Sequence, residues 1–269
     1  MKSNYKHLAK QGSHEWLMGR KTRFGGSEIG TVIKGKVKTI IKQKKKLEEG
    51  FKTNLYCWWG HTFEGVGKSW LTYSNKWEIH EFGSIPSSQW PVAYSPDGVF
   101  INKDLDLWLL EIKCPFLRNV DQNATIKTEY MDQIQIGMRI LPCSKTAFIQ
   151  FKFRKCWGYQ IHKQGKYNRG FHKEQKRSKE QKEIFYGALY WNTAHFIEEE
   201  ELMTKPDKIY LSFECDVVDI VESYNNGNYM YFKCFYIKSE CVPIDPTWNK
   251  HKEIIWKGYE KLIDSTASS

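Results

Sequence analysis

The sequence predicts one α/β domain, and three observations support this fold class. Apolar side chains recur at helical spacing in residues 57–73 and 125–141. Between these segments, residues 92–101 and 105–113 form short apolar runs around turn residues, as successive strands do. No internal repeat and no evident linker divides the 269 residues, which are enough to bury one large core.

The composition points to a polyanionic partner. The chain is 41% hydrophobic and 15% aromatic, which is typical of a globular protein, and its formal net charge is +10. Such a charge favours nucleic acid first and an anionic membrane surface second. No window approaches the roughly 18 apolar residues of a membrane span, and the N-terminus lacks the apolar core of a signal peptide. We therefore expect an intracellular protein of the cytoplasm or nucleus, neither secreted nor bound to a membrane.

The cysteine pattern argues against the commonest zinc and redox motifs. Seven cysteines are scattered along the chain, and none of them forms a Cys-x-x-Cys pair. Their spacing also lacks the clustered ligands of an iron–sulfur centre. We expect reduced thiols, several of them buried.

The N-terminal half is expected to begin with helices and continue with strands. Residues 13–34 predict a Trp-bearing helix, a Gly-Gly break and a second helix, with Ser27 as its N-cap and Glu28 in its first turn. The helix predicted for residues 57–73 presents Glu64. Strand patterns then occupy residues 76–85, 92–101 and 105–113. Trp58, Trp59 and Trp157 are expected in the core, with stacking on an unpaired base as the alternative.

The C-terminal half adds a helix at 125–141, a strand at 145–153 and a closing helix at 249–263. The basic stretch 154–182 has few aliphatic residues, which predicts a loop or an exposed helix. An Asn-Gly step within residues 224–229 predicts a tight hairpin turn. We therefore expect one domain, residues 1–269. Its parts are a core at about 13–152, a basic insertion at about 154–201, and a C-terminal hairpin and helix at about 208–265.

The segment from Trp90 to Phe116 carries the residues most suggestive of chemistry. Asp97 lies in a Ser-Pro-Asp-Gly turn at the end of a strand, and Glu111 and Lys113 lie two apart on the next strand, on one face. The backbone carbonyl of Ile112 is offered at the same edge. Two carboxylates, a carbonyl and water are the oxygen ligands that Mg²⁺ prefers. The lysine can orient or deprotonate an attacking water, or stabilise charge on a phosphate.

Each half of this pattern has an ordinary structural alternative. The Pro-Asp-Gly sequence alone is typical of a surface turn, and Glu-Ile-Lys alone is typical of a solvated strand edge. Joined at this separation, within a basic chain and beside an apolar strand, they favour a metal-dependent phosphodiesterase. Asp104 and Asp106 lie between the two halves, and we expect them in a surface turn.

The motifs resemble the PD-(D/E)xK nucleases, and within them the lambda exonuclease and YqaJ-like viral recombinase family. The resemblance lies in "SPDG", in "LLEIKCPF", in "EYMDQIQIGM" and in the opening "HEWLMGRKTRFGGSEIG", which occur in the family's order. It covers roughly residues 13–152. It implies a restriction-endonuclease-like core, with a central mixed β-sheet flanked by helices. The spacing from Asp97 to Glu111 is longer here than in the phage enzyme.

The resemblance also implies a role for each matching residue. Asp97 and Glu111, with the Ile112 carbonyl, would bind Mg²⁺, for which Mn²⁺ is a possible substitute, and Lys113 would activate the water. Glu64 would lie close to the metal, and Gln133 would orient the nucleophile or the lysine. The residues implied in binding the 5′-phosphate and the DNA are Arg20, Ser27 and Tyr130. A guanidinium and a helix N-terminus both suit a phosphate.

The function implied is a 5′→3′ exonuclease that acts on double-stranded DNA with free ends and leaves 3′ single strands for recombination or repair. The resemblance further implies a strand-annealing partner protein and a homo-oligomer, a trimer in the family. Two other hypotheses stay open at this point. The same core could be an endonuclease on DNA or RNA, or a DNA-binding module that has lost its catalytic activity.

Overall fold

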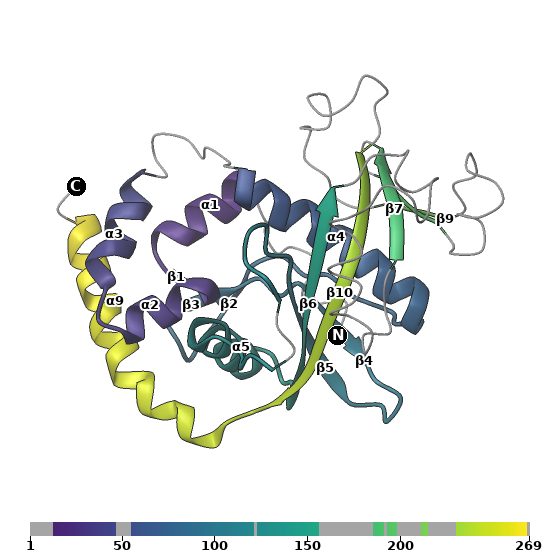
Figure 1. The fold of residues 1–269 in the computed structure, drawn as a ribbon. Helices are drawn as coiled ribbons and strands as arrows, with labels where there is room; N and C mark the ends of the chain where they lie inside the picture. Colours follow the sequence, from purple (N-terminus) through teal and green to yellow (C-terminus); the bar gives the residue numbers. More distant parts are fainter. Residues whose placement is uncertain are drawn as a thin grey trace.

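A computed structural model describes residues 13–46, 55–120, 123–155, 185–190, 193–197, 211–214 and 230–267. Within these residues the chain forms a mixed β-sheet flanked by helices, which confirms the α/β fold class. Figure 1 shows the strands at the centre of the molecule, with helices on either side of them.

Seven described strands form the central sheet: β4 (Gly98–Ile101), β5 (Leu107–Lys113), β6 (Lys145–Lys155), β7 (Phe185–Tyr190), β8 (Thr193–Ile197), β9 (Leu211–Glu214) and β10 (Met230–Pro243). Their order is β4-β5-β6-β10-β7-β8-β9. The β5–β6 pair is parallel and every other pair is antiparallel, so the sheet is mixed. A parallel pair needs a crossover, and α5 (Thr128–Ile140) lies on the connection between β5 and β6.

A second, small sheet lies beside the N-terminal helices. Its strands are β1 (Phe24–Gly25), β2 (Ile85–Pro86) and β3 (Val92–Tyr94), in the order β1-β3-β2. The strand predicted for residues 76–85 is therefore largely wrong. The partner strand β3 has three residues, so it pairs with only Ile85 and Pro86, and His80 makes an isolated bridge with Val99. The other predicted strands of this half, in 92–101 and 105–113, are confirmed.

The helices α4 (Leu55–Asn75) and α5 cover opposite faces of the central sheet. Because successive side chains of a strand point to opposite faces, Leu110 and Ile112 join a core with Trp58 of α4. Leu109 points the other way and joins a core with Ile134 of α5. The prediction that Trp58 and Trp59 are core residues is confirmed, since they are 1% and 4% exposed. The alternation along β5 therefore decides which side chains face α5, and Glu111 is among them.

The N-terminal residues form four short elements that surround the small sheet: α1 (His14–Lys21), the 3₁₀ turn η1 (Gly26–Glu28), α2 (Ile29–Ile33) and α3 (Val37–Lys46). The prediction that Ser27 is an N-cap is wrong. Gly25 holds the N-cap position of η1, and its N–H donates to Glu28 Oε2 at 2.8 Å. The carboxylate of Glu28 therefore caps the turn by reaching back to it, and Ser27 lies inside the turn.

The C-terminal segment returns to the same core. β10 pairs with β6 from Lys145 to Lys155, and η4 (Pro246–His251) and α9 (Lys252–Ala267) follow, which confirms the predicted closing helix. α9 packs against α2 and α3, as Figure 1 shows for the yellow helix. Buried contacts from Ile255 and Leu262 join it to the core that contains Leu109.

Several predictions lie outside the described residues, namely the turn at 224–229, Trp157 and most of the basic stretch 154–182. Among the described cysteines, Cys114, Cys143 and Cys234 are buried, as expected. None of the described helices combines the length and the apolar character needed to cross a membrane.

We expect Gly137→Ala to destabilise the protein by roughly 1–2 kcal/mol, because the new methyl would overlap a ring that cannot move aside. A Cβ at Gly137, in the last turn of α5, would lie 2.5 Å from Cζ of Tyr94 and 2.9 Å from Leu109. Gly60→Ala on α4 is the matched control: nothing lies within 4 Å of its Cβ, so it should stabilise the helix by up to about 1 kcal/mol. Chemical denaturation of both variants measures the difference, and equal free energies of unfolding would contradict the packing argument.

Candidate active site

Asp97 and the end of β5 meet where β4 and β5 begin to pair. Gly98 pairs with Leu110, so the preceding Asp97 lies beside the residues that follow Leu110. Its Oδ2 accepts the N–H of Ile112 at 2.7 Å. In an extended strand the N–H and C=O of one residue point to the same side, so the Ile112 carbonyl is directed to the side where Asp97 lies. The carboxylate and the carbonyl predicted to share an ion therefore lie on one side of β5.

Glu111 is buried at the centre of the site, with 0% of its surface exposed. Its Oε2 accepts the hydroxyl hydrogen of Tyr94 at 2.7 Å, and its Oε1 forms an ion pair with Nζ of Lys113. The Nζ of Lys113 also lies 5.5 Å from the ring centroid of Tyr130. Both oxygens of the carboxylate therefore have partners, as a buried charge requires.

Tyr94 occupies a slot formed by two glycines. A Cβ on Gly26 of η1 or on Gly137 of α5 would overlap its ring, so both positions need glycine for the backbone to approach this closely. The ring is 1% exposed, and burial and the nearby charge of Glu111 raise the pKa of its hydroxyl well above the ordinary value. Tyr94 therefore stays protonated and donates a fixed hydrogen bond to Glu111.

The carboxylates of the site repel one another. Burial, followed by the charge of Asp97, raises the pKa of Glu64 from 4.5 to about 8. Burial also raises the pKa of Glu111 to about 7, where Lys113 opposes the shift and Asp97 adds to it. Glu64 forms an ion pair with Lys68 at 3.2 Å, one turn later on α4. The carboxylates of the site therefore lack sufficient compensating positive charge from the protein.

Lys113 is held in its charged form. Burial favours the neutral amine, but Glu111 and Asp97 outweigh it and raise the pKa of Lys113 above its ordinary value. Of the roles that the sequence left open for this lysine, an ammonium can orient water or stabilise charge on a phosphate, whereas deprotonating water requires a neutral amine. The geometry favours the two roles that use the charge.

One cavity of ≈190 Å³ brings most of the predicted residues together. It is lined by Arg20, Ser27, Glu64, Asp97, Lys113 and Gln133, and also by Trp16, Gly25, Gly26, Ser84, Ala93, Tyr94 and Ser95. Glu111 lies beneath the wall of the cavity, and Tyr130 flanks Lys113 instead of lining it. Asp104 and Asp106 lie away from it: both N–H groups donate to Asn102 Oδ1 in an exposed turn, as expected.

The donor set of this cavity fits a hard divalent cation. Asp97 and Glu111 supply carboxylates, Ile112 supplies a carbonyl, and Glu64 is close enough for its pKa to respond to Asp97. The described residues contain no group of three or more acidic, histidine or cysteine side chains already placed around one point. Carbonyl and water ligands would therefore complete the shell, as is usual for Mg²⁺.

Arg20 reaches the same cavity from α1. Its Nη2 donates to Glu28 Oε1 at 2.7 Å, and its Cζ lies 4.7 Å from the ring centroid of Trp16. The indole Nε1 of Trp16 donates to Ser95 Oγ at 3.1 Å, in the turn that carries Asp97. The predicted phosphate-binding residue and the predicted metal-binding turn are therefore tied together through one tryptophan.

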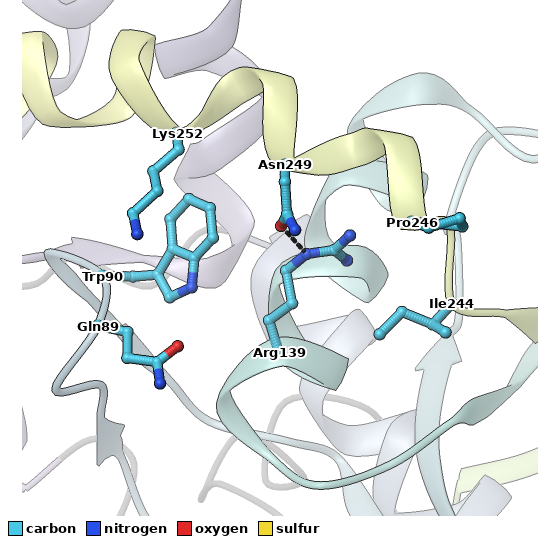
Figure 2. A pocket seen from close by; sticks show the side chains of 7 residues that line it. All are labelled: Gln89, Trp90, Arg139, Ile244, Pro246, Asn249 and Lys252. Atoms are coloured by element: carbon cyan, nitrogen blue, oxygen red, sulfur yellow. Dashed lines mark hydrogen bonds between the residues drawn. The ribbon is translucent and has the colours of Figure 1, made fainter.

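A second cavity, of ≈390 Å³, lies at the C-terminal end of α5 (Figure 2). None of the residues that line it is acidic: they are Gln89, Trp90, Arg139, Ile244, Pro246, Asn249 and Lys252. Arg139 donates from Nε to Asn249 Oδ1 at 2.8 Å and from Nη1 to the Gln135 carbonyl at 2.9 Å. Because Arg139 already donates hydrogen bonds to protein groups in this second cavity, we assign the catalytic chemistry to the smaller cavity, which Asp97 and Lys113 line.

Sequence reasoning missed Trp16, Tyr94 and Ser95 as parts of this site. Ser95 lies inside the quoted Ser-Pro-Asp-Gly turn, so its position next to Asp97 was a usable signal. Tyr94 ends an apolar run, and a buried tyrosine normally has a hydrogen-bond partner for its hydroxyl. The identity of that partner, 17 residues later, carries no local signal.

Comparison with known proteins supports the motif analysis. Residues 15–144 match the family model of the YqaJ-like viral recombinase domain, which confirms the resemblance over this part of the chain. A protein of African swine fever virus is 27% identical in an alignment of length 203, which covers 62% of this chain and 57% of that protein. An uncharacterised protein of Acanthamoeba polyphaga mimivirus is 26% identical in an alignment of length 160, which covers 53% of this chain and 29% of that protein. The matched regions thus span about half or less of these relatives.

Solved structures of an alkaline exonuclease are also similar to the chain. The enzyme from Laribacter hongkongensis gives a TM-score of 0.40 at 20% identity, over 52% of this chain and 74% of that chain. The same exonuclease in complex with dAMP gives a TM-score of 0.49 at 14% identity, over 95% and 94% of the two chains.

In metal-free buffer we expect the free energy of unfolding to fall as the pH rises from 4.5 to about 8. The folded-state pKa values of Glu64 and Glu111 are raised to about 8 and about 7, so the folded state holds these protons more tightly than the unfolded state. The stability they provide is complete below 4.5 and is lost as the pH rises through the raised values.

If the site binds Mg²⁺ or Mn²⁺ as the sequence predicts, the ion should restore this stability, because it would bind the folded state and not the unfolded state. Thermal denaturation at several pH values, with EDTA or with the ion, measures both effects. Asp97→Asn should flatten the pH dependence and weaken the response to the ion. A wild-type melting temperature that changes neither with pH nor on addition of the ion would contradict the assignment of the metal site.

Proposed function

We propose that this chain, which matches the YqaJ-like viral recombinase domain over residues 15–144, is an Mg²⁺-dependent exonuclease. It would degrade double-stranded DNA from the 5′ end and leave 3′ single strands. The observation that carries the proposal is that one cavity is lined both by residues implied in metal binding, Asp97 and Glu64, and by residues implied in phosphate binding, Arg20 and Ser27. A nuclease with both sets in one cavity would hydrolyse the bond next to a bound chain end.

The chemistry would be hydrolysis of a phosphodiester. Asp97, Glu111, the Ile112 carbonyl and Glu64 would hold the ion, which when bound polarises the scissile phosphate and lowers the pKa of a coordinated water. The ammonium of Lys113, fixed by Glu111, would stabilise the negative charge that develops on the phosphate. Gln133, on the cavity wall, would orient the water through its amide.

The chain end would bind at Arg20 and Ser27. Arg20 can donate to the oxygens of a 5′-phosphate, and Ser27 lines the same cavity and can donate its hydroxyl hydrogen. Tyr130 would contact the DNA beside Lys113. The duplex itself would be bound without sequence preference by exposed lysines of α3 and the residues before it: Lys36, Lys38, Lys42 and Lys45.

The name of the matching family supports recombination as the biological setting, and a DNA substrate agrees with the net charge of +10. A strand-annealing partner and a homo-oligomeric assembly, both implied by the sequence resemblance, extend this proposal.

We expect Asp97→Ala and Lys113→Ala to reduce Mg²⁺-dependent digestion of linear duplex DNA by at least about a hundredfold, while DNA binding persists, because each removes a charge from the reacting phosphate or its ion. Asp104→Ala is the control, since this carboxylate lies in the exposed turn of the same hairpin. The measurement is release of nucleotides from 5′-labelled and 3′-labelled duplexes, beside covalently closed circles. Digestion of closed circles would show an endonuclease, and full activity of either variant would refute the site.

A second prediction concerns Arg20. Wild-type protein should digest 5′-phosphorylated ends faster than dephosphorylated ends, and Arg20→Ala should reduce this ratio by about tenfold or more, because a charge-assisted hydrogen bond to the phosphate is lost. The rate on dephosphorylated ends serves as the internal control, since it should change little. Equal wild-type rates on the two kinds of end would discard the assignment.

A further inference from the structure

Lys44 is a buried lysine on a helix whose neighbouring lysines are exposed. Its side chain is 5% exposed, whereas Lys42 and Lys45 of the same helix are exposed to solvent. Its Nζ donates to the carbonyls of Arg20 and Arg23, at 2.7 Å and 3.0 Å, and forms an ion pair with Glu28 at 2.9 Å. An ammonium has three N–H donors, so protein groups satisfy all of them.

Glu28 lies between two cations. Its Oε1 accepts from Arg20 at 2.7 Å, and its Oε2 faces Lys44 and accepts the N–H of Gly25. Burial alone would raise the pKa of Glu28, but Lys44 and Arg20 together lower it below its ordinary value. The carboxylate is therefore ionised, and two positive charges share it.

The surplus positive charge belongs to Arg20. Lys44 has no donor left over, whereas Arg20 lines the cavity, and its buried Nε has no hydrogen-bond partner among the described residues. The guanidinium is also held in place: the Trp16 ring covers it, and a Cβ on Gly25 would lie only 3.2 Å from its Nη2. The network therefore presents one oriented guanidinium with uncompensated charge.

We infer that Lys44 is a positioning residue for the 5′-phosphate of the substrate, acting through Glu28 on Arg20. This inference rests on the proposed function of Arg20. It adds the reason why the proposed phosphate-binding site keeps a net positive charge although Glu28 lies beside Arg20. Without Lys44, Glu28 and Arg20 form a neutral pair, which attracts a dianionic terminal phosphate much less. When Lys44 is present, its ammonium compensates the charge of Glu28, and the positive charge of Arg20 remains available to the phosphate.

The test measures end recognition apart from catalysis. The full chain is titrated in EDTA against a fluorescent hairpin duplex that carries either a 5′-phosphate or a 5′-hydroxyl, and the ratio of the two dissociation constants is compared. Partial unfolding of a variant scales both constants equally and leaves the ratio unchanged. We expect wild-type protein to prefer the phosphate, and Lys44→Met to lower that preference by about tenfold.

Two further variants separate the explanations. Lys45→Met removes the same charge from an adjacent, exposed position that is proposed to bind the duplex backbone, so it should weaken binding of both duplexes equally and keep the wild-type ratio of the two dissociation constants. Lys44→Gln keeps a donor near the Arg20 and Arg23 carbonyls but removes the charge, so it should lose the preference as Lys44→Met does. Two results would overturn the role of Lys44 but leave the phosphate assignment of Arg20 intact. One is a wild-type ratio of dissociation constants in Lys44→Gln, and the other is an equal loss of the phosphate preference in Lys44→Met and Lys45→Met. A wild-type protein without any preference overturns the phosphate assignment of Arg20, and the inference with it.

Discussion

Burial of one carboxylate constrains the rest of this structure. Glu111 has no exposed surface and lies on the α5 face of β5, where an uncompensated charge would be strongly unfavourable. The Tyr94 hydroxyl and the Lys113 ammonium compensate it. Tyr94 in turn requires glycine at positions 26 and 137, so η1 and α5 approach the same ring from two sides. The proposed phosphate-binding turn and the proposed metal site are thereby packed on one tyrosine.

Charge is distributed unevenly along the cavity. Around Asp97, burial raises the pKa values of Glu64 and Glu111, and the charge of Asp97 raises them further against the opposing charges of Lys68 and Lys113. Around Arg20, two cations share Glu28, and positive charge is in excess. A cation bound near Asp97 would compensate the excess negative charge, and an anion bound near Arg20 would compensate the excess positive charge. A substrate phosphate bound together with a divalent ion meets both needs.

The residues that line the cavity lie within the span that matches the YqaJ-like viral recombinase domain, but the scaffold extends beyond it. β10 pairs with β6 on the side away from β5, so β6 becomes an internal strand. α9 packs on α2, which begins directly after Glu28, and on α3, which carries Lys44. The C-terminal segment therefore supports the site without contributing to its wall, in the part of the chain that the structure describes.

The sequence by itself determined the positions of the strands around Asp97, Glu111 and Lys113, because a period of two and a Pro-Asp-Gly turn are local properties. Ordered motifs also indicated Arg20, Ser27, Glu64 and Gln133, which the fold brings to one cavity. Only the tertiary structure decided that Glu28, and not Ser27, caps its turn and that Tyr94 holds Glu111. It also decided that Lys44 is buried whereas Lys42 and Lys45 are exposed. The Tyr94–Glu111 hydrogen bond spans 17 residues, and those of Lys44 span 21 and 24, so no local pattern encodes them. The Glu28 cap spans only three residues, but the sequence did not decide which residue begins the turn.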